Sequence, residues 1–199
     1  MEVTQQNQYD GMIALVEPVV LPDVLDVLIV GGGPAGTAAA FRARELGLAA
    51  LVIDYDDIMK RIRDYAKDKL ILPDFGGGDK MRFPRAGALI EKLAFSPMDK
   101  DDMFRLWKSW YGEFSVPAQT GIELLGLDGR SDGAWKVRAY NHNTKTEIRY
   151  NARHIVLAIG RGVPRRFDIP GNSDGVAYRL NDAVAYVGQP ACVIGGGTS

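Results

Sequence analysis

Two short runs of branched apolar residues lie near the start of the chain, separated by a glycine cluster and a helical pattern. Residues 24–30, VLDVLIV, are almost continuously apolar, which is typical of a strand buried on both faces of a parallel sheet. Residues 37–47, TAAAFRARELG, predict an amphipathic helix that ends near Gly47. A second apolar run over residues 48–54 ends on Asp54. The order strand, glycine turn, helix, strand predicts a βαβ unit.

The middle of the chain carries a further helical pattern. Residues 96–116 place acidic residues in the first turn and apolar residues at helical spacing, so we expect a helix whose aromatic side chains lie in the core rather than on a ligand. Residues 56–69 and 85–93 are weaker helical candidates. The glycine-rich stretch over residues 72–80 lacks the features of a phosphate loop, and we interpret it as a mobile loop.

The second half of the chain has the pattern of short strands. Residues 122–127, 134–140 and 146–152 are separated by turn-forming residues, which predicts a three-stranded antiparallel meander. Buried-strand patterns then follow at residues 154–160 and 190–196. The predicted fold class is therefore α/β: a Rossmann-like domain, with a parallel sheet and helices, plus the meander.

The glycine cluster GGGPAG is a GxGxxG motif in the place where this motif binds dinucleotides, between a strand and a helix. Gly31 allows the tight turn, Gly33 lets a pyrophosphate approach bare backbone, and Gly36 lets the helix pack closely on the strand. Pro34 suits the first helical turn, where its missing N–H costs little. The backbone around Pro34 and Ala35 is expected to bind the phosphates through the N–H groups and dipole of the helix start.

Asp54 ends the second predicted strand, 23 positions after Gly31. This is where a dinucleotide fold places the acid that accepts hydrogen bonds from ribose hydroxyls. The competing interpretation is a glycine-rich surface turn followed by a chance acidic residue. The agreement of order, spacing and flanking strands favours the dinucleotide site.

Together these features resemble the FAD-binding domain of flavoproteins with two dinucleotide-binding domains, the class that includes thioredoxin reductase. The resemblance covers residues 26–54 and 122–199, and rests first on DVLIVGGGPAG, the alanine-rich helix and the acid at the end of the second strand. It implies that main chain near Leu124 contacts the adenine of FAD, although a core residue of the meander would have the same pattern. It also implies that Ala158 and Gly160 lie close to FAD, in a segment similar to the family's second conserved motif.

The last residues, VIGGGTS, resemble the start of the family's inserted NAD(P)H domain, with Gly195 and Gly197 in a second, truncated nucleotide site. Residues 1–23 are polar and then interrupted by prolines, which suits an N-terminal arm or linker. The resemblance implies an incomplete FAD-binding domain over residues 24–190 and the start of an NAD(P)H-binding domain over 191–199. It implies that the chain is the N-terminal part of a longer protein and is weakened or inactive as an oxidoreductase by itself.

The chain lacks the redox dithiol of thioredoxin reductases, because Tyr178 and Asn181 stand where the two cysteines of CxxC would be. Without thiolates, electrons cannot pass from the flavin by disulfide exchange. The resemblance is therefore closer to members without CxxC, among them the bacillithiol disulfide reductase group and ferredoxin–NADP reductases of thioredoxin-reductase type. It implies a flavin-dependent NAD(P)H oxidoreductase, with FAD as cofactor, NAD(P)H as co-substrate and catalytic residues unassigned. An FAD-dependent monooxygenase and a non-catalytic nucleotide-binding module are the alternatives.

Composition narrows the partners and the location. The 24 basic and 25 acidic residues nearly cancel, which gives no reason to expect nucleic acid or an anionic membrane. We expect a small-molecule or small-protein electron acceptor, and the sequence also allows a homodimer. A single cysteine, Cys192, excludes a disulfide framework and is expected in a buried strand. His142 and His154 have no predicted carboxylate partner, so no metal site is expected. With no signal peptide or membrane span predicted, the cytoplasm is the expected location.

Overall fold

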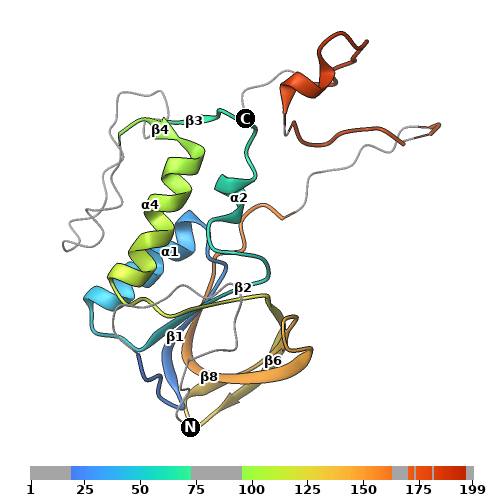
Figure 1. Cartoon of the computed structure of the whole chain (residues 1–199). Helices are drawn as coiled ribbons and strands as arrows, with labels where there is room; N and C mark the ends of the chain where they lie inside the picture. Colours follow the sequence, from blue (N-terminus) through green and yellow to red (C-terminus); the bar gives the residue numbers. More distant parts are fainter. Residues whose placement is uncertain (1–18, 73–95, 163–169, 173, 181, 196–199) are drawn as a thin grey trace.

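The computed structural model describes residues 19–72, 96–162, 170–172, 174–180 and 182–195. Its centre is a six-stranded sheet in the order β5-β2-β1-β8-β7-β6 (Figure 1). β5, β2, β1 and β8 pair in parallel, whereas β8, β7 and β6 pair antiparallel. The strands span Leu25–Val30 (β1), Ala50–Asp54 (β2), Ala118–Thr120 (β5), Ile122–Ser131 (β6), Ala134–Asn141 (β7) and Thr146–Leu157 (β8).

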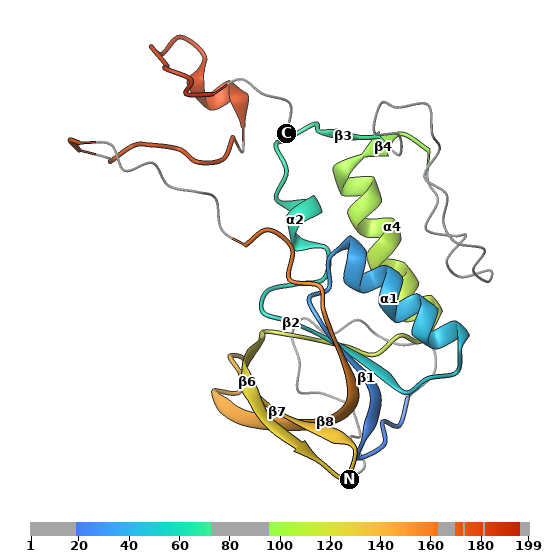
Figure 2. The same cartoon turned by 180° about the vertical axis from the view of Figure 1, so that it is seen from behind.

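Two longer helices lie side by side over the parallel strands, as both views show (Figures 1 and 2). One contact between them is made by Phe41 of α1, whose ring meets those of Trp110 and Tyr111 of α4. A small antiparallel sheet precedes α4. The strands of this small sheet are β3 (Leu70–Ile71) and β4 (Met98–Asp99). The described helices are α1 (Pro34–Glu45), α2 (Lys60–Arg63), α4 (Lys100–Glu113) and the 3-10 helix η1 (Ala183–Tyr186).

The two central parallel strands, β1 and β2, are largely buried on both faces, as their continuous apolar pattern predicts. On one face Ile29 and Val52 pack against α1 and α4. On the other face Leu28 and Leu51 pack against meander residues, among them Val137. The meander therefore curls under the parallel strands, opposite the helices (Figure 2). The predicted α/β class with a Rossmann-like sheet and a meander is confirmed.

The third meander strand and the strand expected at residues 154–160 are one continuous strand, β8. Its first half pairs with β7 and its second half with β1, and Ala152 has partners in both. His154 consequently lies inside this strand instead of at the start of another. A strand shared in this way attaches the meander rigidly to the parallel sheet.

Two other expectations differ from the structure. Within residues 56–69, only Lys60–Arg63 is helical. The buried strand expected at residues 190–196 is absent from its described part, and Cys192 is exposed. A strand is stable when its backbone groups pair with a neighbour, and the sheet pairings among the described residues include none for this segment. Residues 85–93 and nearly all of 72–80 lie outside the described part of the chain.

Candidate nucleotide-binding site

The glycine loop connects β1 to α1 in a conformation that most residues could not adopt. Gly31 has a φ of +104°, and a Cβ there would lie 2.4 Å from the carbonyl oxygen of Ala158. A Cβ on Gly36 would lie 1.8 Å from the carbonyl oxygen of Gly31. By contrast, a Cβ on Gly33 would meet nothing within 4 Å. Gly31 and Gly36 are thus required by packing, while Gly33 faces the open side of the loop.

The start of α1 is suited to an anion. Gly33 is the N-cap residue and no side chain caps the helix, Pro34 occupies the first turn, and that turn contains no acidic residue. The first N–H groups of any helix lack an intrahelical acceptor, and the helix dipole places partial positive charge beside them. A phosphate group at this position would receive these N–H groups, that of Ala35 among them, against bare glycine backbone.

Asp54 supports the glycine loop directly. Its Oδ2 accepts a hydrogen bond from the backbone N–H of Gly32 at 2.6 Å, and its Oδ1 accepts one from Asp56 at 2.9 Å. Burial raises the pKa of the Asp54 carboxyl, and these two hydrogen bonds partly oppose the rise. Each carboxylate oxygen still has acceptor capacity for a ribose hydroxyl.

Residues 55–59, which follow Asp54, also contact the glycine loop at Gly32. The N–H of Met59 donates to the carbonyl of Gly32 at 2.9 Å, so residues 54–59 bind both polar groups of Gly32. A Cβ on Gly32 would lie 2.3 Å from Cδ1 of Ile58, so these residues pack directly on the loop. Met59 is fully buried with a φ of +58°. Sequence reasoning missed this contact because neither apolar periodicity nor a motif marks Met59.

The segment that follows β8 lies against the glycine loop. Ala158 donates its N–H to the carbonyl of Val30 at 2.7 Å, and its own carbonyl faces Gly31. Gly160 has a φ of +67°, a conformation that favours glycine. Leu124, in contrast, belongs to β6 and is half-buried against the meander core.

The other candidate residues lie apart from the loop or outside the described chain. Gly195 is described and has a φ of +104°, the same as that of Gly31. Gly197 and Asn181 lie outside the described residues. The expectation that His142 lacks a carboxylate partner is wrong, because its Nε2 lies 2.8 Å from Oε2 of Glu123. These two residues are adjacent only through the pairing of β6 with β7, which spacing along the chain does not reveal.

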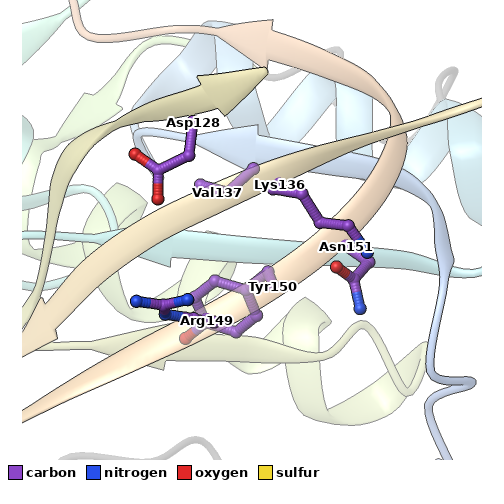
Figure 3. A pocket seen from close by; sticks show the side chains of 6 residues that line it. All are labelled: Asp128, Lys136, Val137, Arg149, Tyr150 and Asn151. Carbon is purple, nitrogen blue, oxygen red and sulfur yellow. The ribbon is translucent and has the colours of Figure 1, made fainter. Parts of the chain in front are cut away.

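A separate hollow lies on the meander (Figure 3). It contains none of the predicted nucleotide-binding residues. Its lining is Asp128, Lys136, Val137, Arg149, Tyr150 and Asn151. Within the described part of the chain, no three histidine, cysteine or acidic side chains are arranged to hold a metal ion. None of the described helices has the length and apolar character needed to cross a membrane.

Comparison with known proteins gives relatives for this arrangement. A ferredoxin–NADP reductase of Ignicoccus hospitalis is 28% identical over 176 residues, covering 86% of this chain and 49% of the relative. A ferredoxin–NADP reductase of Burkholderia vietnamiensis is 30% identical over 182 residues, covering 87% of this chain and 45% of the relative. The chain therefore spans about half the length of the curated relatives that it matches.

A solved structure and a family model agree with these relatives. The bacillithiol disulfide reductase of Bacillus cereus has the same fold, with a TM-score of 0.65, 22% identity, and coverage of 82% of this chain and 48% of that one. The model of a family described as pyridine nucleotide-disulphide oxidoreductase matches residues 28–199. The match includes the glycine loop, the acid that binds it and the segment after β8. The chain belongs to the pyridine nucleotide-disulphide oxidoreductase family.

Proposed function

We propose that this chain is the FAD-binding part of an NAD(P)H-dependent oxidoreductase without a redox dithiol. The observation that carries the proposal is the glycine loop, which is closed by packing at Gly31 and Gly36 but open at Gly33. A loop selected only for tight packing would not need a bare position on its open side. An approaching pyrophosphate does need one.

The residues present fit FAD. Gly33, Pro34 and Ala35 would bind the pyrophosphate at the start of α1, and Asp54 would accept the ribose hydroxyls. Ala158 borders the loop from the segment after β8, and Gly160 follows two residues later in the same segment, which supports a place for both beside the cofactor. When bound, the flavin would supply the hydride and electron transfer chemistry, while the chain supplies position and access.

The absence of a dithiol argues against a disulfide as the immediate electron acceptor. Tyr178 stands in place of a cysteine, and the one cysteine of the chain, Cys192, is exposed in a segment without regular structure. Relatives named ferredoxin–NADP reductase support a small electron-carrier protein as the partner. We further propose that Gly195 and Gly197 begin the NAD(P)H site, because CVIGGG repeats the order of an apolar run and three glycines found in LIVGGG at the first site. A homodimer and a cytoplasmic location stay predictions.

Titration with two flavins tests the proposal. The purified chain is titrated with FAD and, as the matched ligand, with FMN, while flavin fluorescence is recorded. FMN carries the isoalloxazine and one phosphate but lacks the AMP half of FAD, and with it the second phosphate and the ribose that the start of α1 and Asp54 would bind. We expect stoichiometric binding of FAD and at least about tenfold weaker binding of FMN, because two sets of charge-assisted hydrogen bonds are lost. Equal affinity for both flavins, or no binding of FAD, would contradict the proposal.

A further inference from the structure

A buried hydrogen bond links the end of the glycine loop to α4, a helix whose aromatic side chains the sequence assigns to the core alone. Thr37, the first residue after the GxGxxG motif, places its Oγ1 2.8 Å from the phenolic oxygen of Tyr111. Both residues are fully buried. Burial raises the pKa of the Tyr111 hydroxyl well above its ordinary value, so this hydroxyl keeps its proton at any physiological pH.

The neighbours of this pair provide acceptors for the Thr37 proton. The Thr37 hydroxyl also lies 3.5 Å from the carbonyl of Gly32 and 3.8 Å from the sulfur of Met59. If Tyr111 donates to Thr37, the threonine proton is free to point at one of these two acceptors. Both protons are then used, and the chain of contacts runs from α4 through α1 to Gly32.

A second contact attaches α4 to the other side of the loop. Lys108 reaches both carboxylate oxygens of Asp57, at 3.0 and 3.2 Å. Asp57 belongs to the segment over residues 54–59, whose Asp54 and Met59 bind the polar groups of Gly32. Helix α4 therefore contacts both supports of the glycine loop, and only the Thr37 contact is buried.

We propose that Tyr111 is a positioning residue for the cofactor site, and that it acts through Thr37 to hold the glycine loop in the form that accepts a pyrophosphate. The link to the cofactor rests on the proposed function, whereas the effect on the loop does not. Loss of the Thr37 hydroxyl removes the hydrogen-bond partner of the buried Tyr111 hydroxyl, which is costly. Loss of the Tyr111 hydroxyl removes the hydrogen bond that joins Thr37 to α4, so either change favours loop conformations other than the competent one. Affinity falls in proportion to the fraction of molecules in the competent form.

Three variants isolate the hydrogen bond from packing. Tyr111→Phe removes one hydroxyl, Thr37→Val removes the other with little change of shape, and Thr37→Ser keeps the hydroxyl. The matched control is Tyr150→Phe, which removes a β8 hydroxyl that donates to Gln119 of β5 at 2.5 Å, away from Thr37 and Tyr111. Amide hydrogen exchange is measured in peptides that cover residues 30–37 and residues 134–152, and FAD affinity is measured by fluorescence.

We expect Tyr111→Phe and Thr37→Val each to speed exchange in residues 30–37 by about fivefold or more, and to weaken FAD binding by a similar factor. The double variant Tyr111→Phe/Thr37→Val should show loop exchange no faster, and FAD binding no weaker, than the more affected single variant, because both substitutions remove the same hydrogen bond. Thr37→Ser and Tyr150→Phe should resemble the unmodified chain in loop exchange and in FAD affinity.

Two results would overturn the proposal. One is loop exchange in Tyr111→Phe and Thr37→Val that equals that of the unmodified chain. The other is exchange that rises equally in residues 30–37 and 134–152, since this would mean that the pair supports the whole core. If the unmodified chain binds no FAD, the proposed function fails, while the exchange measurement still decides whether Tyr111 holds the loop.

Discussion

Replacing Gly36 with alanine tests the packing of the glycine loop. The added Cβ would lie 1.8 Å from the carbonyl oxygen of Gly31 and 3.4 Å from the Cβ of Ala158. Carbon and oxygen atoms that are not bonded approach to about 3.3 Å, so the helix and the loop must separate by about 1.5 Å. The oxygen belongs to backbone at the end of β1, so no side-chain rotation can relieve the contact.

The size of the effect can be estimated from opposing contributions. Overpacking against backbone costs about 3 kcal/mol, at the upper end of the usual range. Alanine recovers about 1 kcal/mol in a helix relative to glycine. The net loss in the free energy of unfolding is therefore about 2 kcal/mol, which lowers Tm by about 4–8 °C in a chain of this size. The displaced α1 start should weaken FAD binding about tenfold or more, because charge-assisted hydrogen bonds to the pyrophosphate are lost.

Gly33 provides the matched control for this substitution. A Cβ there meets nothing within 4 Å, and its φ of −75° suits any residue. Gly33→Ala should lower the free energy of unfolding by no more than about 1 kcal/mol, since the site is an N-cap position. It should still weaken FAD binding, because it places a methyl group where the pyrophosphate approaches. Thermal unfolding and FAD titration therefore separate the two glycines. A Gly36→Ala chain that melts within about 1 °C of the unmodified chain and binds FAD equally well would refute the reasoning.

Three other side chains give further predictions. Asp54→Asn leaves one backbone N–H without its acceptor, so FAD should bind about tenfold more weakly. Because burial raises the pKa of the Asp54 carboxyl, the unmodified chain should lose FAD affinity as the pH falls toward 3.8, starting at a higher pH than an exposed aspartate would, and the variant should show no such loss. The hydrogen bond from the N–H of Ala49 lowers the pKa of the Asp26 carboxyl, with burial opposing and Arg153 adding to this effect. The carboxylate therefore stabilises the fold fully above the unfolded pKa of 3.8, and this contribution is lost as pH falls through the folded pKa. In urea denaturation at a series of acidic pH values, the free energy of unfolding of Asp26→Asn should fall less steeply with pH than that of the unmodified chain. Phe41→Ala empties a fully buried site among three aromatic rings and should lower the free energy of unfolding by about 3–5 kcal/mol, visible as a lower urea midpoint at unchanged slope.

The βαβ unit could be predicted because each of its parts has a strong local cause. Branched residues favour the buried strands, and Gly31 and Gly36 are the residues that the turn and the close packing permit. β5 was not predicted, since three residues carry too little pattern to distinguish a strand from a loop. It forms because β2 offers it a free edge, which is a property of the assembled sheet.

The same apolar pattern led to different outcomes at residues 154–160 and 190–196. Over residues 154–157 the run continues β8 and pairs with β1, whereas residues 190–195 have no regular structure and leave Cys192 exposed. Local sequence reports the preference of a segment for extended backbone but does not report its partner. The position of a strand in a sheet is therefore the part of this fold that local sequence predicts least well.

The supports of the glycine loop also depend on contacts between distant residues. The GxGxxG motif explains why the backbone can turn at Gly31 and be approached at Gly33, but glycine is flexible and does not by itself hold one conformation. The loop is held by residues 54–59, which bind both polar groups of Gly32, and by Thr37, which Tyr111 contacts from α4. These contacts span 22 and 74 positions along the chain. A motif search therefore locates a dinucleotide site of this kind, whereas the rigidity that gives the site its affinity depends on residues outside the motif.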